Sequence, residues 1–280
     1  MKTSTYAQEQ FAKIESMVEK LSTELNQGKS ERFKEYLIFA SKFHKYSMGN
    51  QMLIHYQMKT ATRVASYDKW IELGRQVQAG QKGIKILSPI IKKEKNKQTE
   101  TEDRLVGFRV SNVYDISQTE GKELPKFFQD LNDDGLALYN TLKSVMIEQG
   151  ITVEEKDLGT TQGVSYGGRV EIHSGIDGTN KFLTLIHEFA HEILHKGSEN
   201  AAIPRGIKEC QAEAAAYIVA NVFGIESPVS SDYLINWGND VETLKANLNP
   251  VIKASKTIIS LLSQENESEE QLNEEALVAA

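Results

Sequence analysis

Three histidines and two glutamates alternate along the segment LTLIHEFAHEILHKG, with types and spacing that suit a metal ion. His187 and His191 are four residues apart, so in a helix their imidazoles project from one face, one turn apart. Two imidazoles placed in this way can share one Zn²⁺. The carboxylate of Glu188 can then reach a water on the metal and act as a general base. This H-E-x-x-H pattern predicts hydrolytic chemistry, and its alternative is a pair of surface histidines.

A catalytic zinc site needs a third protein ligand, and the segment KECQAEAAAYIVANVFG offers two candidates. Glu209 and Glu213 are four apart on one helical face, among alanines that let two helices approach closely. We predict Glu209 as the third ligand and Glu213 as a carboxylate that orients a histidine; the reverse assignment stays open. His195 is expected to bond the last carbonyls of its helix, and Cys210 to be a small buried apolar side chain.

Helical apolar spacing followed by alternation predicts helices and then a β-hairpin in the first part of the chain. The two predicted strands are RQVQAGQKGIKILSPI and LVGFRVSNVYDI, joined by a charged tip. The expected helices are 6–27, 31–45, one capped by Ser47, and a short one from Ser66 to Gly74.

The second part predicts helices at 128–149, 180–195, 206–223 and 241–264, and a short strand at 167–174. Gly121 and Pro125 favour a domain boundary. The expected fold is α+β: a helical and β-hairpin domain at 1–123, a zincin-like domain at 124–264, and an acidic disordered tail at 265–280.

Charge divides unevenly along the chain. Residues 1–97 carry 18 Lys+Arg against 9 Asp+Glu, although the net charge of the whole chain is −7. A basic N-terminal part favours a polyanion as partner, and its alternative is a solvated basic face. The sequence has no membrane-length apolar run, no signal-peptide pattern and only one cysteine, which together predict a cytoplasmic protein.

The basic part interleaves cations with aromatic residues, a combination that suits single-stranded nucleic acid. Cations attract phosphates, and exposed rings stack on unpaired bases. The candidates from this argument are Lys42, Lys45, Tyr46, Arg63, Trp70, Arg75, Lys82 and Lys85, with Lys59, Tyr56, Lys69 and Tyr67 among them along the chain. Trp70 is equally consistent with a core position.

The run from KYSMGNQMLIHYQ to GQKGIKILSPI, followed by VYDISQTEG, resembles the N-terminal domain of ArdC-type antirestriction proteins. The resemblance covers about residues 33–123 and implies binding of single-stranded DNA. Family stretches usually read GEKG where this chain has GQKG. The family motif falls on Tyr46, Ser47, Asn50, Gln57, Trp70, Gly74, Arg75, Gly80, Lys82 and Gly83. The resemblance thus adds Ser47, Asn50 and Gln57 to the candidate DNA-binding residues.

The segments TLIHEFAHEILH and KECQAEAAAYIVANVFGI resemble the zincin-type domain of the ImmA/IrrE metallopeptidases. This resemblance implies a peptide-bond hydrolase with one Zn²⁺ per chain, or another divalent metal, and Glu188 as its base. In such folds an edge strand holds the substrate backbone, and residues 167–174 are the candidate strand.

Together these features predict an ArdC-like antirestriction protein of a mobile element, which binds single-stranded DNA and carries a zinc metallopeptidase-type site. One alternative is a regulatory metalloendopeptidase that cleaves a repressor. Another is a non-catalytic DNA-binding protein with a structural metal site. The peptide substrate does not follow from the sequence.

Overall fold

The computed structural model describes residues 4–95, 101–124, 135–197, 200, 202–227 and 240–263. These residues form two compact units that alternate along the chain. The first unit holds the described residues of Met1–Met17 and Gly49–Pro125, and the second holds those of Val18–Met48 and Lys126–Glu265. Helix α1 (Thr5–Asn26) thus begins in the first unit and ends in the second. Helices and short sheets occur in one chain, so the predicted α+β class is confirmed.

A long β-hairpin dominates the first unit. Its elements are α3 (Met48–Gln57), β1 (Val64–Ala65), α4 (Tyr67–Glu72), β2 (Arg75–Val77), β3 (Ile84–Lys95), β4 (Thr101–Asp115), the 3-10 turn η1 (Ile116–Gln118) and β5 (Thr119–Gly121). Strand β4 pairs antiparallel with β3 and β1. The hairpin is therefore present as predicted. Residues 75–77, which the sequence placed in its first strand, instead form β2 and pair with β5.

Capping residues set the ends of the short helix in this unit. The Ser66 hydroxyl accepts the backbone N–H of Lys69 at 3.2 Å, which caps α4 at its first turn. Gly74 follows α4 with a φ of 75°, in the left-handed region that ends helices and favours glycine. Both positions were predicted from the sequence.

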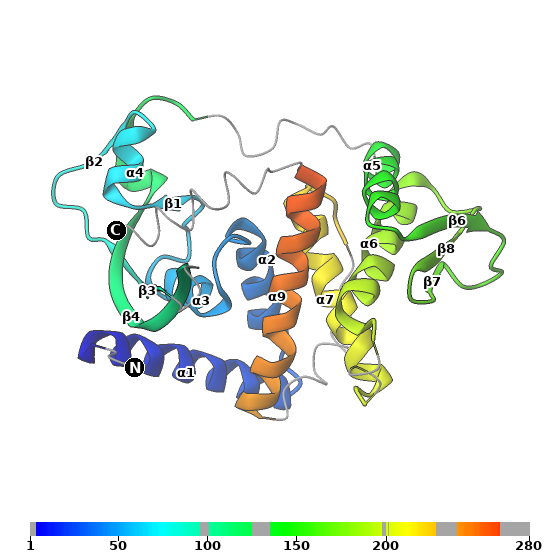
Figure 1. Ribbon diagram of the computed structural model, residues 1–280, viewed down its shortest axis with the longest axis horizontal. Coiled ribbons are helices and arrows are strands. Elements are labelled where there is room, and N and C mark those ends of the chain that lie inside the picture. The colour runs from blue at the N-terminus through cyan, green and yellow to red at the C-terminus, as the bar shows by residue number, and fades with distance from the viewer. Residues whose placement is uncertain are drawn as a thin grey trace. The chain divides into compact units, whose positions relative to one another are not determined.

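Helix α6 lies at the centre of the second unit. The elements of this unit, besides the end of α1, are α2 (Glu31–Lys42), α5 (Gly135–Glu148), β6 (Thr152–Lys156), β7 (Gly163–Ser165), β8 (Arg169–His173), α6 (Gly178–His195), α7 (Arg205–Val222) and α9 (Val241–Ser263). Helix α6 contacts α5, α7, α9, β7 and β8 (Figure 1). One of its faces buries Phe182, Leu185, Ile186 and Phe189. This apolar face holds α6 in place against the core.

The three-stranded sheet of the second unit has the order β6-β8-β7. Strand β8 pairs parallel with β6 on one side and antiparallel with β7 on the other. The expectation that residues 167–174 hold a substrate backbone is therefore wrong, because both edges of β8 are already hydrogen-bonded. Among the described strands of this sheet, the edge strand beside α6 is β7.

Helix α2 packs against α7, in the second unit. The predicted domain at 1–123 had placed it with the hairpin instead. Helix α2 buries large side chains, including Phe33, Tyr36 and Leu37, whereas α7 buries mainly alanines. A helix surface of small residues admits bulky side chains from a neighbour, which accounts for the contact. The predicted tail at 265–280 lies outside the described residues.

None of the described helices combines the length and the apolar character that crossing a bilayer requires.

Candidate metal centre and nucleic-acid interface

Asp177 is the N-cap of helix α6. The Asp177 carboxylate accepts the backbone N–H of Asn180 at 3.0 Å, which fixes the first turn. With the apolar face of α6 buried, the helix turns His187 and His191 toward α7. The two rings lie side by side, with 3.1 Å between their Nε2 atoms.

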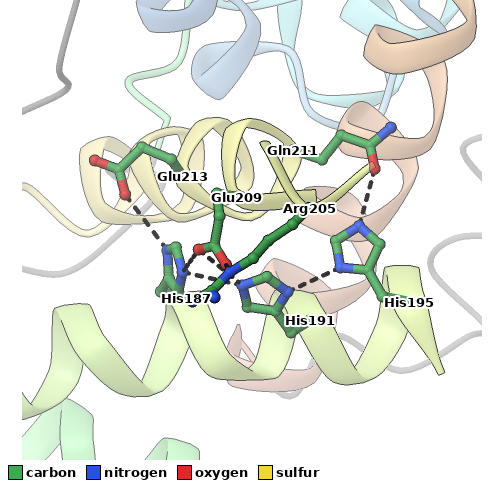
Figure 2. Close-up of polar contacts among 7 residues, drawn as sticks. All are labelled: His187, His191, His195, Arg205, Glu209, Gln211 and Glu213. Atoms are coloured by element: carbon green, nitrogen blue, oxygen red, sulfur yellow. Dashed lines mark hydrogen bonds and ion pairs between the residues drawn. The ribbon is translucent and has the colours of Figure 1, made fainter. Parts of the chain in front are cut away.

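Glu209 of α7 meets both imidazoles. Its Oε2 atom lies 3.5 Å from Nε2 of His187 and 3.5 Å from Nε2 of His191 (Figure 2). One donor atom from each of the three residues lies within 4.8 Å of the others. Ala212 and Ala216 of the same helix are buried. Their small side chains let α7 lie close to α6. Two imidazole nitrogens and one carboxylate oxygen that converge in this way fit a divalent metal of the zinc type.

A second carboxylate lies on the far side of the first ring. Glu213 Oε2 is 3.4 Å from Nδ1 of His187, whereas Glu209 faces the Nε2 atoms of both rings. The geometry therefore favours Glu209 over Glu213 as third ligand. Glu213 has the position from which a carboxylate orients a ligating histidine. Arg205 contacts the other oxygen of Glu209 at 3.6 Å from a side chain that is 92% exposed.

His195 does more than end its helix. Its Nδ1 lies 2.9 Å from Nδ1 of His191, and its Nε2 lies 2.9 Å from Oε1 of Gln211. Both ring nitrogens thus have side-chain partners, and the expected bond to the last carbonyls of α6 is not made by the ring. Cys210 is buried, as predicted.

Glu188 is buried beside the two histidines, and burial raises the pKa of its carboxyl above the usual range. Strand β7 passes close to it. A Cβ atom added at Gly163 would lie 2.5 Å from Thr184 and 3.1 Å from Oε1 of Glu188. Only glycine lets the strand approach the glutamate this closely.

The charges of the cluster shift one another. Burial lowers the pKa of His187, but its contacts with Glu209 and Glu213 outweigh burial and raise the pKa to about 9. The same contacts, from His187 and His191, hold the pKa of Glu209 well below its usual range. Without a metal, positive charge on the His187 imidazole therefore offsets negative charge of the carboxylates.

Glu192 is a further anchor, which the sequence did not reveal. Its carboxylate accepts the Ser165 hydroxyl at 2.6 Å and the backbone N–H groups of Gly167 and Gly168 at 2.8 and 2.6 Å. Both glycines have positive φ, so they can turn their amides toward one carboxylate. This buried side chain fastens the β7–β8 turn to α6 one residue after His191.

The predicted DNA-binding residues divide between the two units. Lys42, Lys45, Tyr46 and Ser47 belong to the second unit, and the others belong to the first. Of the cations, Lys42, Lys82 and Lys85 are exposed, whereas Lys45 and Arg63 are partly buried. The exposed residues Lys82 and Lys85 lie at the start of β3.

Two polar positions of the ArdC motif hold the hairpin in place. Asn50 donates to the backbone oxygen of Leu87 at 2.9 Å and accepts its N–H at 2.8 Å. Gln57 makes the same pair of bonds to Lys85, both at 2.9 Å. These amides thus have a structural role at the edge of β3, and their contact with DNA stays a prediction.

Two further predicted DNA-binding residues are also structural. Trp70 is fully buried, and its indole N–H donates to the backbone oxygen of Tyr114 at 2.8 Å. Its ring therefore offers no face to a base, and this prediction was wrong. The Arg75 guanidinium bonds the hydroxyl and the carbonyl of Thr119 and the carbonyl of Lys122. It holds β5 and the residue after it, instead of reaching toward a phosphate.

Tyr56 is an exposed aromatic residue of the first unit, with a side chain that is 63% exposed. It precedes Gln57, which bonds to the backbone of Lys85. Its counterpart on α4, Tyr67, is 46% exposed. The sequence argument named both tyrosines among the interleaved aromatics.

The described chain is thus a mixed α+β protein with a candidate His/Glu metal centre in its second unit. Residues 4–115 match the family described as the N-terminal domain of anti-restriction factor ArdC. This part of the chain is therefore similar to the N-terminal domain of ArdC, as its sequence motifs predicted.

Similarity also extends beyond that domain. The uncharacterized protein pXO2-81 of Bacillus anthracis is 24% identical over 285 aligned positions, which cover 84% of this chain and 48% of the relative. This chain thus spans about half the length of that relative.

Two crystal structures of the antirestriction ArdC protein from plasmid R388 are also similar. The metal-free form has a TM-score of 0.49 at 15% identity, covering 79% of this chain and 86% of that one. The Mn(II)-bound form has a TM-score of 0.48 at 16% identity, covering 78% and 84%.

Proposed function

We propose that this protein is a cytoplasmic antirestriction protein with two activities. Its N-terminal region binds single-stranded DNA, and its second unit hydrolyses a peptide bond at a zinc-type centre. The observation that carries the hydrolytic part is the buried carboxylate of Glu188 beside His187, His191 and Glu209. A metal site that only stabilises the fold has no need of this fourth, non-ligating acid.

His187, His191 and Glu209 would hold the metal, with Zn²⁺ favoured by the nitrogen and oxygen donors. When bound, the metal supplies a Lewis acid that activates water and polarises a carbonyl. The raised pKa of Glu188 brings its carboxyl closer to neutral pH. A base with such a pKa can take a proton from the attacking water and pass it to the leaving amine.

The free edge of β7 is the place for a substrate backbone. This strand runs beside Glu188 at Gly163, and Glu192 fixes its far end to α6. A peptide added to that edge would hydrogen-bond along β7 and lie next to the base. A protein segment in extended conformation is therefore the proposed substrate class.

The DNA-binding part is supported by exposed cations and an exposed ring on a rigid support. Lys82, Lys85 and Tyr56 are exposed, and Gln57, the residue after Tyr56, fixes the backbone of Lys85. Cations of this kind bind phosphates without regard to sequence, and tyrosines stack on unpaired bases. The match of residues 4–115 to the N-terminal domain of anti-restriction factor ArdC supports the antirestriction role.

The hydrolytic part is tested with Glu188→Gln. This change keeps the size of the side chain and removes the base. We expect unchanged metal content by elemental analysis and loss of antirestriction in cells. Full antirestriction by the variant, with metal bound, would remove peptide hydrolysis from the function.

The DNA-binding part is tested by titrating the same protein with single- and double-stranded oligonucleotides at several salt concentrations. We expect tighter binding to single strands and a steep loss of affinity with salt. Absence of binding to single strands at low salt would contradict it, whatever the result for Glu188.

A further inference from the structure

A continuous row of hydrogen bonds leads from the candidate metal centre to α9. Nδ1 of His191 lies 2.9 Å from Nδ1 of His195, and Nε2 of His195 lies 2.9 Å from Oε1 of Gln211 (Figure 2). The amide nitrogen of Gln211 then donates to Oδ1 of Asn247 at 3.1 Å. Four side chains from α6, α7 and α9 thus form one row that ends at a ligating ring.

The two amide side chains of this row are buried in a largely apolar layer. Gln211 and Asn247 are only 4% and 7% exposed, between helices whose buried residues are otherwise mainly apolar. Burying an amide costs free energy unless it is hydrogen-bonded. The amide nitrogen of Gln211 bonds to Asn247, and its carbonyl oxygen is directed at His195.

The directions of the bonds follow from the chemistry of the groups. The carbonyl oxygen of Gln211 can only accept, so Nε2 of His195 carries the hydrogen. In a neutral ring, Nδ1 of His195 then has the lone pair, and Nδ1 of His191 must donate to it. This leaves the lone pair of His191 on Nε2, which lies 3.5 Å from Oε2 of Glu209. The row thus directs the donor nitrogen into the cluster.

We propose that Gln211, held by Asn247, is a positioning residue for the metal centre. Acting through His195, it fixes the tautomer and the ring orientation of His191, so that metal affinity depends on the contact between α7 and α9. The Glu213 carboxylate orients the ring of His187 in a comparable way. The two ligating rings are therefore oriented differently: one by a charged carboxylate, the other by neutral groups. This inference depends on the metal site proposed above.

The decisive variant is Gln211→Met, which keeps the length of the side chain and removes the acceptor. Zn²⁺ affinity of the full chain is measured by competition with a chromophoric chelator. Loss of a partner that orients a metal ligand weakens metal binding by about 10–100-fold, which is the expected result. Gln211→Glu keeps an acceptor oxygen and is expected to retain affinity within a few-fold. A packing defect alone would not be rescued in this way.

A matched control separates orientation from helix packing. Ser255 of α9 is buried and also contacts α7, through the backbone oxygen of Ala215 at 3.5 Å. Ser255→Ala is expected to leave Zn²⁺ affinity unchanged. Absorption of the Co²⁺-loaded proteins gives a second readout, because altered orientation of His191 changes the ligand field.

The outcomes separate this inference from the metal site itself. Wild-type protein that binds neither Zn²⁺ nor Co²⁺ would overturn both. Wild-type affinity and an unchanged Co²⁺ spectrum in Gln211→Met would overturn the positioning role alone. Should Gln211→Met fail to fold, Asn247→Leu removes the support of Gln211 one step further away. It is expected to weaken Zn²⁺ binding by several-fold, and wild-type affinity in that variant would contradict the proposal.

Discussion

Glu213 Oε2 lies 3.4 Å from Nδ1 of His187, on the opposite side of the ring from Glu209. Two glutamates one turn apart on α7 therefore contact the two nitrogens of one imidazole. The Nε2 atom of His187 faces His191 and Glu209, and its Nδ1 atom contacts the carboxylate of Glu213, which orients the ring. Helical spacing alone, four residues on each helix, is enough to produce this arrangement.

We expect Glu213→Gln to weaken metal binding without abolishing it. The amide can still accept from His187 Nδ1, but it lacks the charge that raises the basicity of the ring. The expected loss of Zn²⁺ affinity is about 10-fold, at the lower end for such partners. Chelator competition measures it. Glu242→Gln, which removes a charge from an 84% exposed side chain on α9, is the control and should not change affinity. Equal affinity of both variants would show that Glu213 has no orienting role.

Metal binding is expected to release protons at neutral pH. His187 has a pKa raised to about 9, so the metal-free ring is protonated at pH 7, whereas a ligating imidazole must be neutral. Zn²⁺ affinity should therefore rise with pH through neutrality and level off above about pH 9. Calorimetry in buffers of different ionisation enthalpy counts the protons. A binding enthalpy that is independent of the buffer would contradict the expectation.

The same pKa fixes the sign for the stability of the metal-free protein. The pKa of His187 in the folded protein exceeds the ordinary histidine value of 6.5. Protonation thus stabilises the fold fully below about pH 6.5, and this stabilisation is lost as the pH rises toward 9. Glu209, whose pKa is lowered, contributes in the other direction: its stabilisation is present above its unfolded pKa and is lost in acid. Urea unfolding from acid to about pH 9, with chelator present, measures both effects.

We expect Glu192→Ala to loosen the β7–β8 turn. The change removes the acceptor of three hydrogen bonds, from Ser165, Gly167 and Gly168. Bonds to a charged acceptor contribute about 1.5–3 kcal/mol each when buried, but water can replace part of this at the exposed Gly167. The expected loss of unfolding free energy is about 2–3 kcal/mol. Chemical unfolding and amide exchange at 163–168 measure it, and unchanged exchange there would contradict the anchoring role.

The sequence identified those parts of the site that depend on helical periodicity. His187, His191 and Glu209 converge because each helix repeats its face every three to four residues. Contacts made by tertiary packing were missed. Glu192 bonds residues 24 to 27 positions earlier, and no local pattern indicates which turn a buried carboxylate will bind.

The hairpin side shows the same limit. Asn50 and Gln57 are seven residues apart, on one face of a helix, yet their partners Leu87 and Lys85 lie 37 and 28 positions away. The family motif suggested DNA contacts for both residues. Their amides instead satisfy the backbone groups along an edge of β3. The family motif thus contains residues that maintain the fold of the domain as well as residues available to a ligand.

We therefore expect Asn50→Ala to lower stability and Lys85→Gln to weaken DNA binding. Asn50→Ala leaves the N–H and C=O of Leu87 without their partner and should cost about 1–3 kcal/mol of unfolding free energy. Lys85→Gln should leave stability unchanged and reduce the slope of DNA affinity against salt by about one. Thermal unfolding and oligonucleotide titration separate the two. A normal salt slope in Lys85→Gln would remove this lysine from the interface.

The last prediction contrasts an exposed ring with a buried one. Tyr56 is 63% exposed and Trp70 is fully buried. Tyr56→Leu removes a surface on which a base can stack, so binding of single-stranded DNA should weaken by about 1–3 kcal/mol while stability stays unchanged. Trp70→Phe removes the indole N–H bond to Tyr114 and leaves a cavity, so stability should fall while DNA affinity of the folded fraction is kept. Binding and thermal unfolding are measured on both variants at one salt concentration. The opposite pattern, with DNA affinity lost only in Trp70→Phe, would place the stacking surface elsewhere and make Tyr56 an ordinary surface residue.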